Sequence, residues 1–213
     1  MTTFEHAMLG VNGALATGLH QKFGWKIVAI AGISAASPDW DGLPIVYSVE
    51  LFNRAHRVWG HNILSCVVLG VVIGILDYRF DLVTRAARLI DRCVRFGISE
   101  ANLALREQFS NYGTLVWCAV AILACLSQLP ADMVVSGTAT LADWELQPFW
   151  PFSDQGVVFP MVPWGDPGMT IVFVLGMFAM LRWKSSFRTI ACLTLAGVVA
   201  YILARGLMGQ ATH

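Results

Sequence analysis

The stretch NILSCVVLGVVIGIL, residues 62–76, decides the fold class of this chain. It carries no charged side chain, and it lies between a polar stretch at 56–61, HRVWGH, and a charged segment at 77–111. Such a run between polar flanks is typical of a helix in a lipid bilayer, although a full crossing needs about 20 residues. The stretch therefore predicts a short membrane helix.

The composition of the whole chain agrees with this prediction. Of the 213 residues, 56% are hydrophobic and 13% are charged, and the mean hydropathy is +0.62. Soluble domains carry about 25% charged residues, so the composition excludes an ordinary soluble enzyme. The 14 basic and 14 acidic residues give zero net charge. Because no basic excess is present to displace counterions from phosphates, a nucleic-acid partner is not expected.

Further apolar runs repeat the pattern along the chain, at 7–19, 25–37, 113–131, 169–181 and 189–204. No long polar stretch divides the chain into separately folding parts. We therefore predict an all-α, polytopic membrane protein of about six spans, forming a single membrane domain over residues 1–213. Most runs are shorter than about 20 residues, which indicates a thinned or recessed membrane face.

The segment 77–111 contains an amphipathic helix. Leu82 and Leu89 belong to an apolar stripe at helical spacing, whereas Arg85 and Arg92 belong to the opposite, basic stripe. This pattern predicts a helix that lies on the membrane surface or docks on a partner.

Six spans alternate in direction, so the N-terminus, 38–61, 132–168 and the C-terminus share one face of the membrane. Eleven of the fourteen basic residues fall on the other face: Lys22, Lys26, Arg79, Arg85, Arg88, Arg92, Arg95, Arg106, Arg182, Lys184 and Arg188. By the positive-inside rule that second face, with 77–111, is cytoplasmic and the loop 132–168 is extracytoplasmic. The protein is then expected in a bacterial-type inner (plasma) membrane.

Most of the histidines and acidic residues gather on the extracytoplasmic face. His6 precedes the first span, Asp39 and Asp41 follow the second, and His56 and His61 open the third. Pro38 disfavours helix at Ser37, so we expect both carboxylates on an irregular turn that aims them at one point. Imidazole and carboxylate are ligands of divalent metal ions.

The fourth span adds two more polar groups, since Gln128 and Asp132 are four residues apart and share one helix face. Ionisable groups at membrane depth cost about 2.5–3.5 kcal/mol each on insertion scales, so such a cluster needs a compensating interaction. On the residues alone, a salt bridge from Asp39 or Asp41 to Arg57 competes evenly with metal binding.

The order of these short motifs resembles the YdjM-type family, inner-membrane proteins described as membrane-bound metal-dependent hydrolases. The matching pieces are His6, then SPDWD at 37–41, then HRVWGH at 56–61, then Asp132, then WPFSD at 150–154 with Asp-Pro at 166–167. The family pattern has Gly, Thr and Ser where this chain has Val58, Gly60 and Asn62. It also has histidine at the position of Gln128, and an amide oxygen is a poorer zinc ligand than imidazole.

The resemblance implies a divalent metal ion, zinc in the first instance, with His6, Asp39, His61 and Asp132 as ligands. Asp41 and His56 are then candidates for orienting a ligand, acting as general base or holding a second ion, and Arg57 for binding an anionic substrate group. The implied function is hydrolysis of a lipid or another phosphoester or ester.

Membrane lipids are the expected partners, because aromatic residues keep this face among the lipid headgroups: Trp144, Phe149, Trp150, Phe152 and Trp164. An equally simple interpretation of these aromatic residues is an interfacial belt. The alternative function is a non-enzymatic structural, regulatory or ion-permeation protein with a vestigial His/Asp cluster, which the Gln128 departure favours.

Overall fold

A computed structural model of the protein describes residues 1–95, 100–137 and 144–210. Within these ranges the chain is all-helical and forms no β-strand. In chain order the helices are α1 (Thr3–Ala16), α2 (Leu19–Phe23), α3 (Trp25–Ala36), the 3-10 helix η1 (Ser37–Val46), α4 (Val49–Ala55), α5 (Ile63–Phe80), α6 (Leu82–Val94), α7 (Glu100–Leu103), α8 (Asn111–Val134), α9 (Gly168–Arg182), the 3-10 helix η2 (Lys184–Ser186) and α10 (Phe187–Gln210).

Each of the six apolar runs forms a helix, but only some of these helices are long enough to cross a membrane. Among the described residues, three have the length and apolar composition of a span: α5, α8 and the stretch 184–208 that contains α10. Helices α9, α1 and α3 have only 15, 14 and 12 residues, against the ~20 of a full crossing. The prediction of a helical membrane protein is confirmed, whereas six spans are not.

The first two runs are short because glycine and proline interrupt them. Gly18 and Gly24 have φ of 75° and 76°, a conformation that costs glycine least, and they separate α1, α2 and α3. Helix α3 ends at Ala36, and the chain continues directly into η1. Ser37, which Pro38 was expected to keep out of the helical region, has φ −67° and ψ −31° and is helical, so that expectation was wrong. The two runs therefore form a compact helical hairpin.

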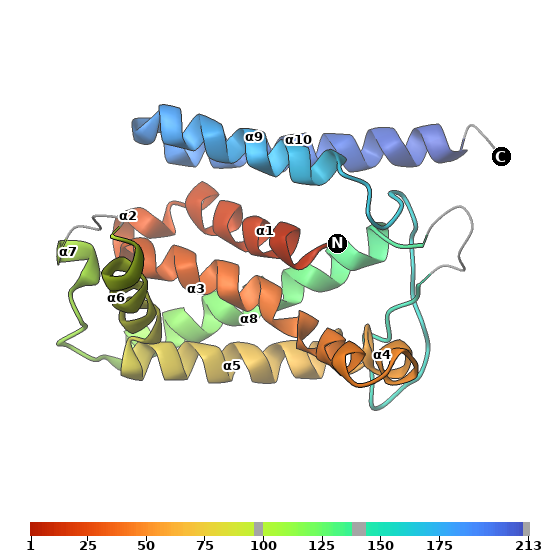
Figure 1. Ribbon diagram of the computed structural model, residues 1–213, viewed down its shortest axis with the longest axis horizontal. Helices are drawn as coiled ribbons and strands as arrows, with labels where there is room; N and C mark the ends of the chain where they lie inside the picture. Colours follow the sequence, from red (N-terminus) through yellow and green to blue (C-terminus); the bar gives the residue numbers. More distant parts are fainter. Residues whose placement is uncertain (96–99, 138–143, 211–213) are drawn as a thin grey trace.

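This hairpin occupies the middle of the molecule. In Figure 1, α1 and α3 lie between the α9–α10 pair and the α5–α8 pair. The helices approach closely at glycines: a Cβ on Gly10 would lie 2.2 Å from the Ala31 carbonyl oxygen, and one on Gly70 would lie 2.5 Å from Ile122 Cα. Small residues at crossings are typical of helices packed in membranes, where close contact replaces the hydrophobic effect between helices.

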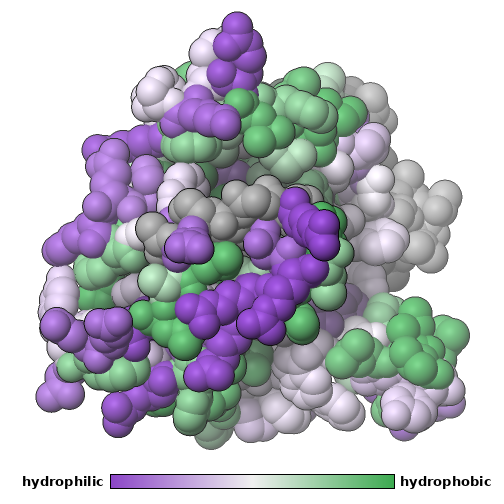
Figure 2. Space-filling view, turned by 60° about the vertical axis from the view of Figure 1, so that its left-hand side comes forward, coloured by the Kyte–Doolittle hydropathy of each residue, from purple (hydrophilic) through white to green (hydrophobic). Residues whose placement is uncertain are grey.

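The long helices run roughly side by side, so the molecule has two distinct ends (Figure 1). The basic end comprises α2, α6, α7 and the turn between α9 and α10. The loop end comprises the N-terminus, η1, α4 and residues 144–167. Figure 2 turns the basic end toward the viewer and shows hydrophilic side chains gathered over it. The basic residues expected on one face of the membrane, on α2, α6 and the turn between α9 and α10, thus lie at one end of the molecule (Figure 1).

Two predicted boundaries shift slightly. Helix α5 continues to Phe80, so Asp77 and Tyr78, which are both buried, belong to this helix rather than to the charged segment 77–111. The amphipathic helix expected within that segment is α6, whose apolar Leu82 and Leu89 are exposed. At the loop end α8 extends to Val134, which shortens the loop expected at 132–168.

Candidate metal centre

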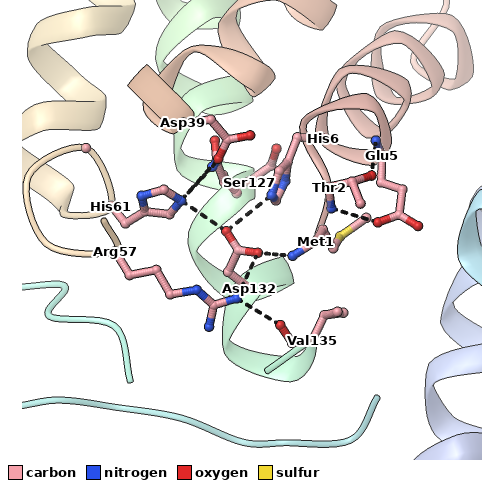
Figure 3. Close-up of polar contacts among 12 residues, drawn as sticks. Met1, Thr2, Glu5, His6, Asp39, Arg57, His61, Ser127, Asp132 and Val135 are labelled. Atoms are coloured by element: carbon pink, nitrogen blue, oxygen red, sulfur yellow. Dashed lines mark hydrogen bonds and ion pairs between the residues drawn. The ribbon is translucent and has the colours of Figure 1, made fainter. Parts of the chain in front are cut away.

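Four side chains with metal-binding atoms converge at the loop end, each from a different element (Figure 3). Asp39 comes from η1, His61 from the turn before α5, and Asp132 from the last turn of α8. His6 lies inside α1, not before it as expected, because the helix begins at Thr3. These are the four residues that were predicted as ligands. The fold brings them together although the first and the last are 126 residues apart in the sequence.

The spacing of the four atoms matches the ligand sphere of a metal ion. Asp132 Oδ2 lies 3.2 Å from His6 Nε2 and 3.3 Å from His61 Nε2. Asp39 Oδ1 lies 3.3 Å from His61 Nε2. With metal–ligand bonds of about 2.0–2.1 Å, neighbouring ligands of a tetrahedral zinc ion lie about 3.3 Å apart. Three of the six separations among these atoms therefore have the length expected between neighbouring ligands of one ion.

Several of these atoms are buried without a hydrogen bond. His6 Nδ1, His6 Nε2 and Asp39 Oδ2 have no hydrogen-bond partner within the described ranges, although His6 Nε2 approaches Asp132. Buried polar atoms are normally paired, so unpaired ones need an explanation. The residues present fit a divalent cation, which would satisfy nitrogen and carboxylate oxygen together.

Gln128 also reaches this centre. Its amide Nε2 lies 2.5 Å from Asp39 Oδ1 and 2.8 Å from His61 Nε2, while its Oε1 is buried without a partner in the described chain. Rotation of the amide exchanges its nitrogen and oxygen, which have nearly the same shape. The side chain is thus placed to donate to the two ligands or to offer its oxygen to an ion.

Asp41 contacts His61 at Nδ1, the ring nitrogen that faces away from the other proposed ligands. Asp41 Oδ2 lies 2.9 Å from His61 Nδ1 and accepts a hydrogen bond from the Gly60 N–H at 2.8 Å, and its Oδ1 lies 2.8 Å from His56 Nδ1. A carboxylate on the far nitrogen of a metal-binding histidine fixes the ring's tautomer and direction. This geometry places Asp41 where an orienting residue belongs.

The two carboxylates of the SPDWD motif do not aim at one point. The segment is a 3-10 helix instead of an irregular turn, and residues two apart on such a helix diverge. Asp39 and Asp41 therefore contact opposite sides of the same imidazole of His61. A second group of candidate ligands, Asp41, His56 and His61, also lies close together.

The electrostatics of the cluster follow from these contacts. Burial raises the pKa of Asp41, but hydrogen bonds from His56 and His61 outweigh burial and hold this pKa below its usual value. Burial lowers the pKa of His61, but hydrogen bonds to Asp132, Asp39 and Asp41 hold it well above 6.5. Binding of a metal ion at His61 Nε2 would require this nitrogen to be free of a proton.

The side chain of Arg57 is buried and forms hydrogen bonds within the protein. Its Nη1 donates to Ser136 Oγ at 2.8 Å and to the Trp144 carbonyl at 2.7 Å, and its Nη2 donates to the Val135 carbonyl at 3.1 Å. Nη2 also lies 3.6 Å from Asp132 Oδ1, and the guanidinium stacks on the Trp144 ring. Arg57 thus ties the chain after α8 to the site.

Two further contacts were not anticipated from the sequence. Asp132 Oδ1 forms an ion pair with the Met1 amino group. Buried Glu5 accepts a hydrogen bond from Thr170 Oγ1 at 2.6 Å, which joins α1 to α9 beside the site. The signal for Glu5 was present, because Thr2-x-x-Glu5 is a capping box and both of its hydrogen bonds form.

Comparison with known proteins places the chain in a family. The model of the family described as YdjM inner membrane protein matches residues 1–211 of the 213. The chain belongs to the YdjM family. A search of curated proteins and a search of solved structures gave no match. The family description supports an inner-membrane location and agrees with the apolar helices α5, α8 and α10.

The structure explains two departures of this YdjM protein from the pattern quoted above. Asn62 replaces serine at the N-cap of α5, where its side chain accepts a hydrogen bond from the Ser65 N–H at 2.8 Å, and both residue types are good caps. Gly60 replaces threonine where a Cβ would lie 1.9 Å from the Pro38 carbonyl oxygen. The close approach of the two motifs here requires glycine.

Proposed function

We propose that this YdjM protein is a membrane-bound hydrolase that uses one divalent metal ion to cleave an ester or phosphoester bond. His6, Asp39, His61 and Asp132 hold the ion, and zinc is the ion proposed first because two imidazoles and two carboxylates suit it. The observation that carries the proposal is the 3.2–3.3 Å spacing of buried ligand atoms around Asp132 and His61.

The ion, when bound, lowers the pKa of a water molecule and polarises the oxygen of the scissile bond. The protein's own residues position and deprotonate that water. Asp41 holds the His61 ring in place through Nδ1. Asp39 Oδ2, buried and without a hydrogen-bond partner in the described residues, accepts the proton of the attacking water. The bond to the leaving alcohol then breaks, and the leaving oxygen takes up the proton that Asp39 holds.

The site is proposed to face the extracytoplasmic side of the membrane. Support comes from the basic side chains on α2, α6 and the α9–α10 turn, which lie at the opposite end of the molecule from the site (Figure 1). Basic residues favour the cytoplasmic side.

The test is metal content measured together with hydrolysis. The detergent-solubilised protein, incubated with zinc and desalted, is expected to retain one ion per chain and to hydrolyse a fluorogenic ester or phosphodiester. Asp39→Ala is expected to lose both, and His20→Ala, which removes a histidine at the basic end, neither. A folded wild-type protein that retains no zinc, manganese or iron would overturn the proposal.

A second candidate function is favoured by Gln128 alone. Its amide nitrogen lies 2.5 Å from Asp39 and 2.8 Å from His61, where it satisfies in part the polar atoms that an ion would bind. On that observation the cluster is a vestigial site in a structural or regulatory membrane protein. Absence of metal together with an unchanged fold in Gln128→Ala would favour this candidate.

A further inference from the structure

An apolar cavity begins close to the metal centre and runs along the helices away from it. The cavity has a volume of about 260 Å³ and lies between α1, α3, α8 and α10. Along α1 and its C-cap the lining extends from Leu9 to Thr17, and on α8 from Ser127 back to Val120. Leu9 is three residues after His6, and Ser127 is next to Gln128. One end of the cavity therefore lies within a helical turn of the site.

The lining offers nothing to a polar ligand. Apart from glycine, alanine and aliphatic side chains, its members include only two hydroxyl residues. Ser127 Oγ donates to the Ala124 carbonyl at 2.7 Å and Thr17 Oγ1 to the Gly13 carbonyl at 2.9 Å. Both hydroxyls are thus engaged with the backbone of their own helix, and the cavity presents hydrocarbon.

The dimensions and position fit one end of a lipid. The distance along α1 from Leu9 to Thr17 is about 12 Å at 1.5 Å per residue, close to the ~15 Å of hydrocarbon in one leaflet of a bilayer. Leu123 is 67% exposed at the border of the cavity, on a helix that has the character of a membrane span. The cavity therefore opens toward the surrounding hydrocarbon.

We propose that this cavity binds an acyl chain of a bilayer lipid and that the ester or phosphoester of the same lipid lies at the His/Asp centre. The inference rests on the proposed hydrolase function and narrows its substrate class to lipids. The lipid enters sideways past Leu123, its chain follows α1 and α8 toward the basic end, and its polar linkage stays beside Ser127 and Gln128.

Gly13 supplies a variant that closes the cavity without disturbing the fold. Gly13 lines the cavity, and a Cβ built on it meets no atom within 4 Å. Gly13→Leu therefore fills open space, and it replaces a helical glycine with a better helix former. The matched control is Ala200→Leu, since Ala200 is exposed on α10 and does not line the cavity.

The experiment places the full-length protein in nanodiscs of phosphatidylethanolamine and phosphatidylglycerol containing one of two photoactivatable phosphatidylglycerols. One carries a diazirine near the ester and the other at the end of the acyl chain. After irradiation and digestion, mass spectrometry is expected to find the ester-proximal label near Leu9 and Ser127 and the chain-end label near Thr17 and Val120. Gly13→Leu should lose the chain-end label, and Ala200→Leu should retain it.

Two outcomes overturn the inference. One is cavity labelling that shows no order between the two probes, which would mean that no acyl chain lies along the cavity in the proposed direction. The other is labelling in Gly13→Leu equal to that of the wild type. Metal content is measured on the same samples. Ordered labelling without metal would refute the hydrolase and leave a lipid-binding cavity, whereas metal without ordered labelling would refute the lipid substrate alone.

Discussion

Both ends of the helix bundle bury carboxylates, but the groups that contact these carboxylates differ between the two ends. At the basic end Asp77 accepts hydrogen bonds from the Val83 N–H at 2.8 Å and from Trp117 Nε1 at 3.0 Å, and Asp81 accepts from Lys26 Nζ at 3.1 Å. The Arg106 N–H also donates to Asp81. These acids are paired with donors that hold α5, α6 and α8 together.

At the loop end the acids contact imidazole nitrogens in addition to ordinary donors: Asp132 pairs with the Met1 amino group and also lies beside His6 Nε2 and His61 Nε2. Asp39 Oδ2 and both nitrogens of His6 lack hydrogen bonds within the described residues. A buried carboxylate alone is therefore no sign of function, because a fold can satisfy it with ordinary donors. The loop end differs because metal-binding atoms lie close together there and several of them have no hydrogen-bond partner among the described residues.

The first prediction concerns the sides of the membrane on which the two ends lie. The expected effect is the largest, because each cysteine is either labelled or not labelled. Cys93 is exposed on α6 at the basic end, and Glu145 is exposed at the loop end. In intact cells a membrane-impermeant thiol reagent should label Glu145→Cys, built in a cysteine-free background, and should not label a variant that keeps only Cys93. The reverse pattern would place the site in the cytoplasm.

The second prediction contrasts two carboxylates. Asp132→Asn removes a proposed ligand and should weaken zinc binding by more than the 10- to 100-fold typical of residues that only support ligands. Asp81→Asn should leave zinc affinity unchanged and lower stability, because a buried network at the basic end loses a charged acceptor. Zinc affinity is measured by chelator competition and stability by thermal unfolding. Equal zinc affinities in the two folded variants would make the loop-end cluster purely structural.

A third, smaller effect is expected from Asp41→Asn. The amide can still accept from one donor but no longer carries the charge that orients His61 and His56. Zinc affinity should fall by about 10- to 100-fold, less than for Asp132→Asn. Glu50→Gln, which alters an exposed ion pair with Arg54 on α4, is the control and should not change the affinity. A loss in Asp41→Asn as large as that in Asp132→Asn would make Asp41 a ligand itself.

The smallest predicted change is a gain. Gln128→His places an imidazole between Asp39 and His61, and nitrogen suits zinc better than an amide oxygen does. Zinc affinity should rise severalfold, and any ester hydrolysis should change with it. An unaltered affinity in a folded variant would remove this position from the metal centre and weaken the comparison with the family pattern.

Much of the fold followed from local sequence. The apolar runs gave every long helix, and the alternation of polar and apolar residues identified α6. The number of complete spans did not follow, because the positive φ at Gly18 and Gly24 turns the first two runs into a short hairpin. Hydropathy records how apolar a run is and does not record where its backbone turns.

The site was predictable as a set of residue types and less so as a geometry. His6, Asp39, His61 and Asp132 were identified from motif order, and they converge. That Asp39 and Asp41 flank one imidazole depends on the 3-10 geometry of η1, which Pro38 signals only in part. The role of Arg57 in holding Val135 and Trp144 depends on contacts about 80 residues away, which no local pattern contains.

The wide separation of the four proposed ligands has a consequence for biosynthesis. His6 and Asp39 flank the first hairpin and leave the ribosome early, whereas Asp132 is made only after α5 and most of α8. The nascent chain would therefore enter the membrane with two of the four proposed ligands made before Asp132. If these four residues bind an ion, metal loading would follow insertion of α8, and ion uptake would report that the bundle is assembled.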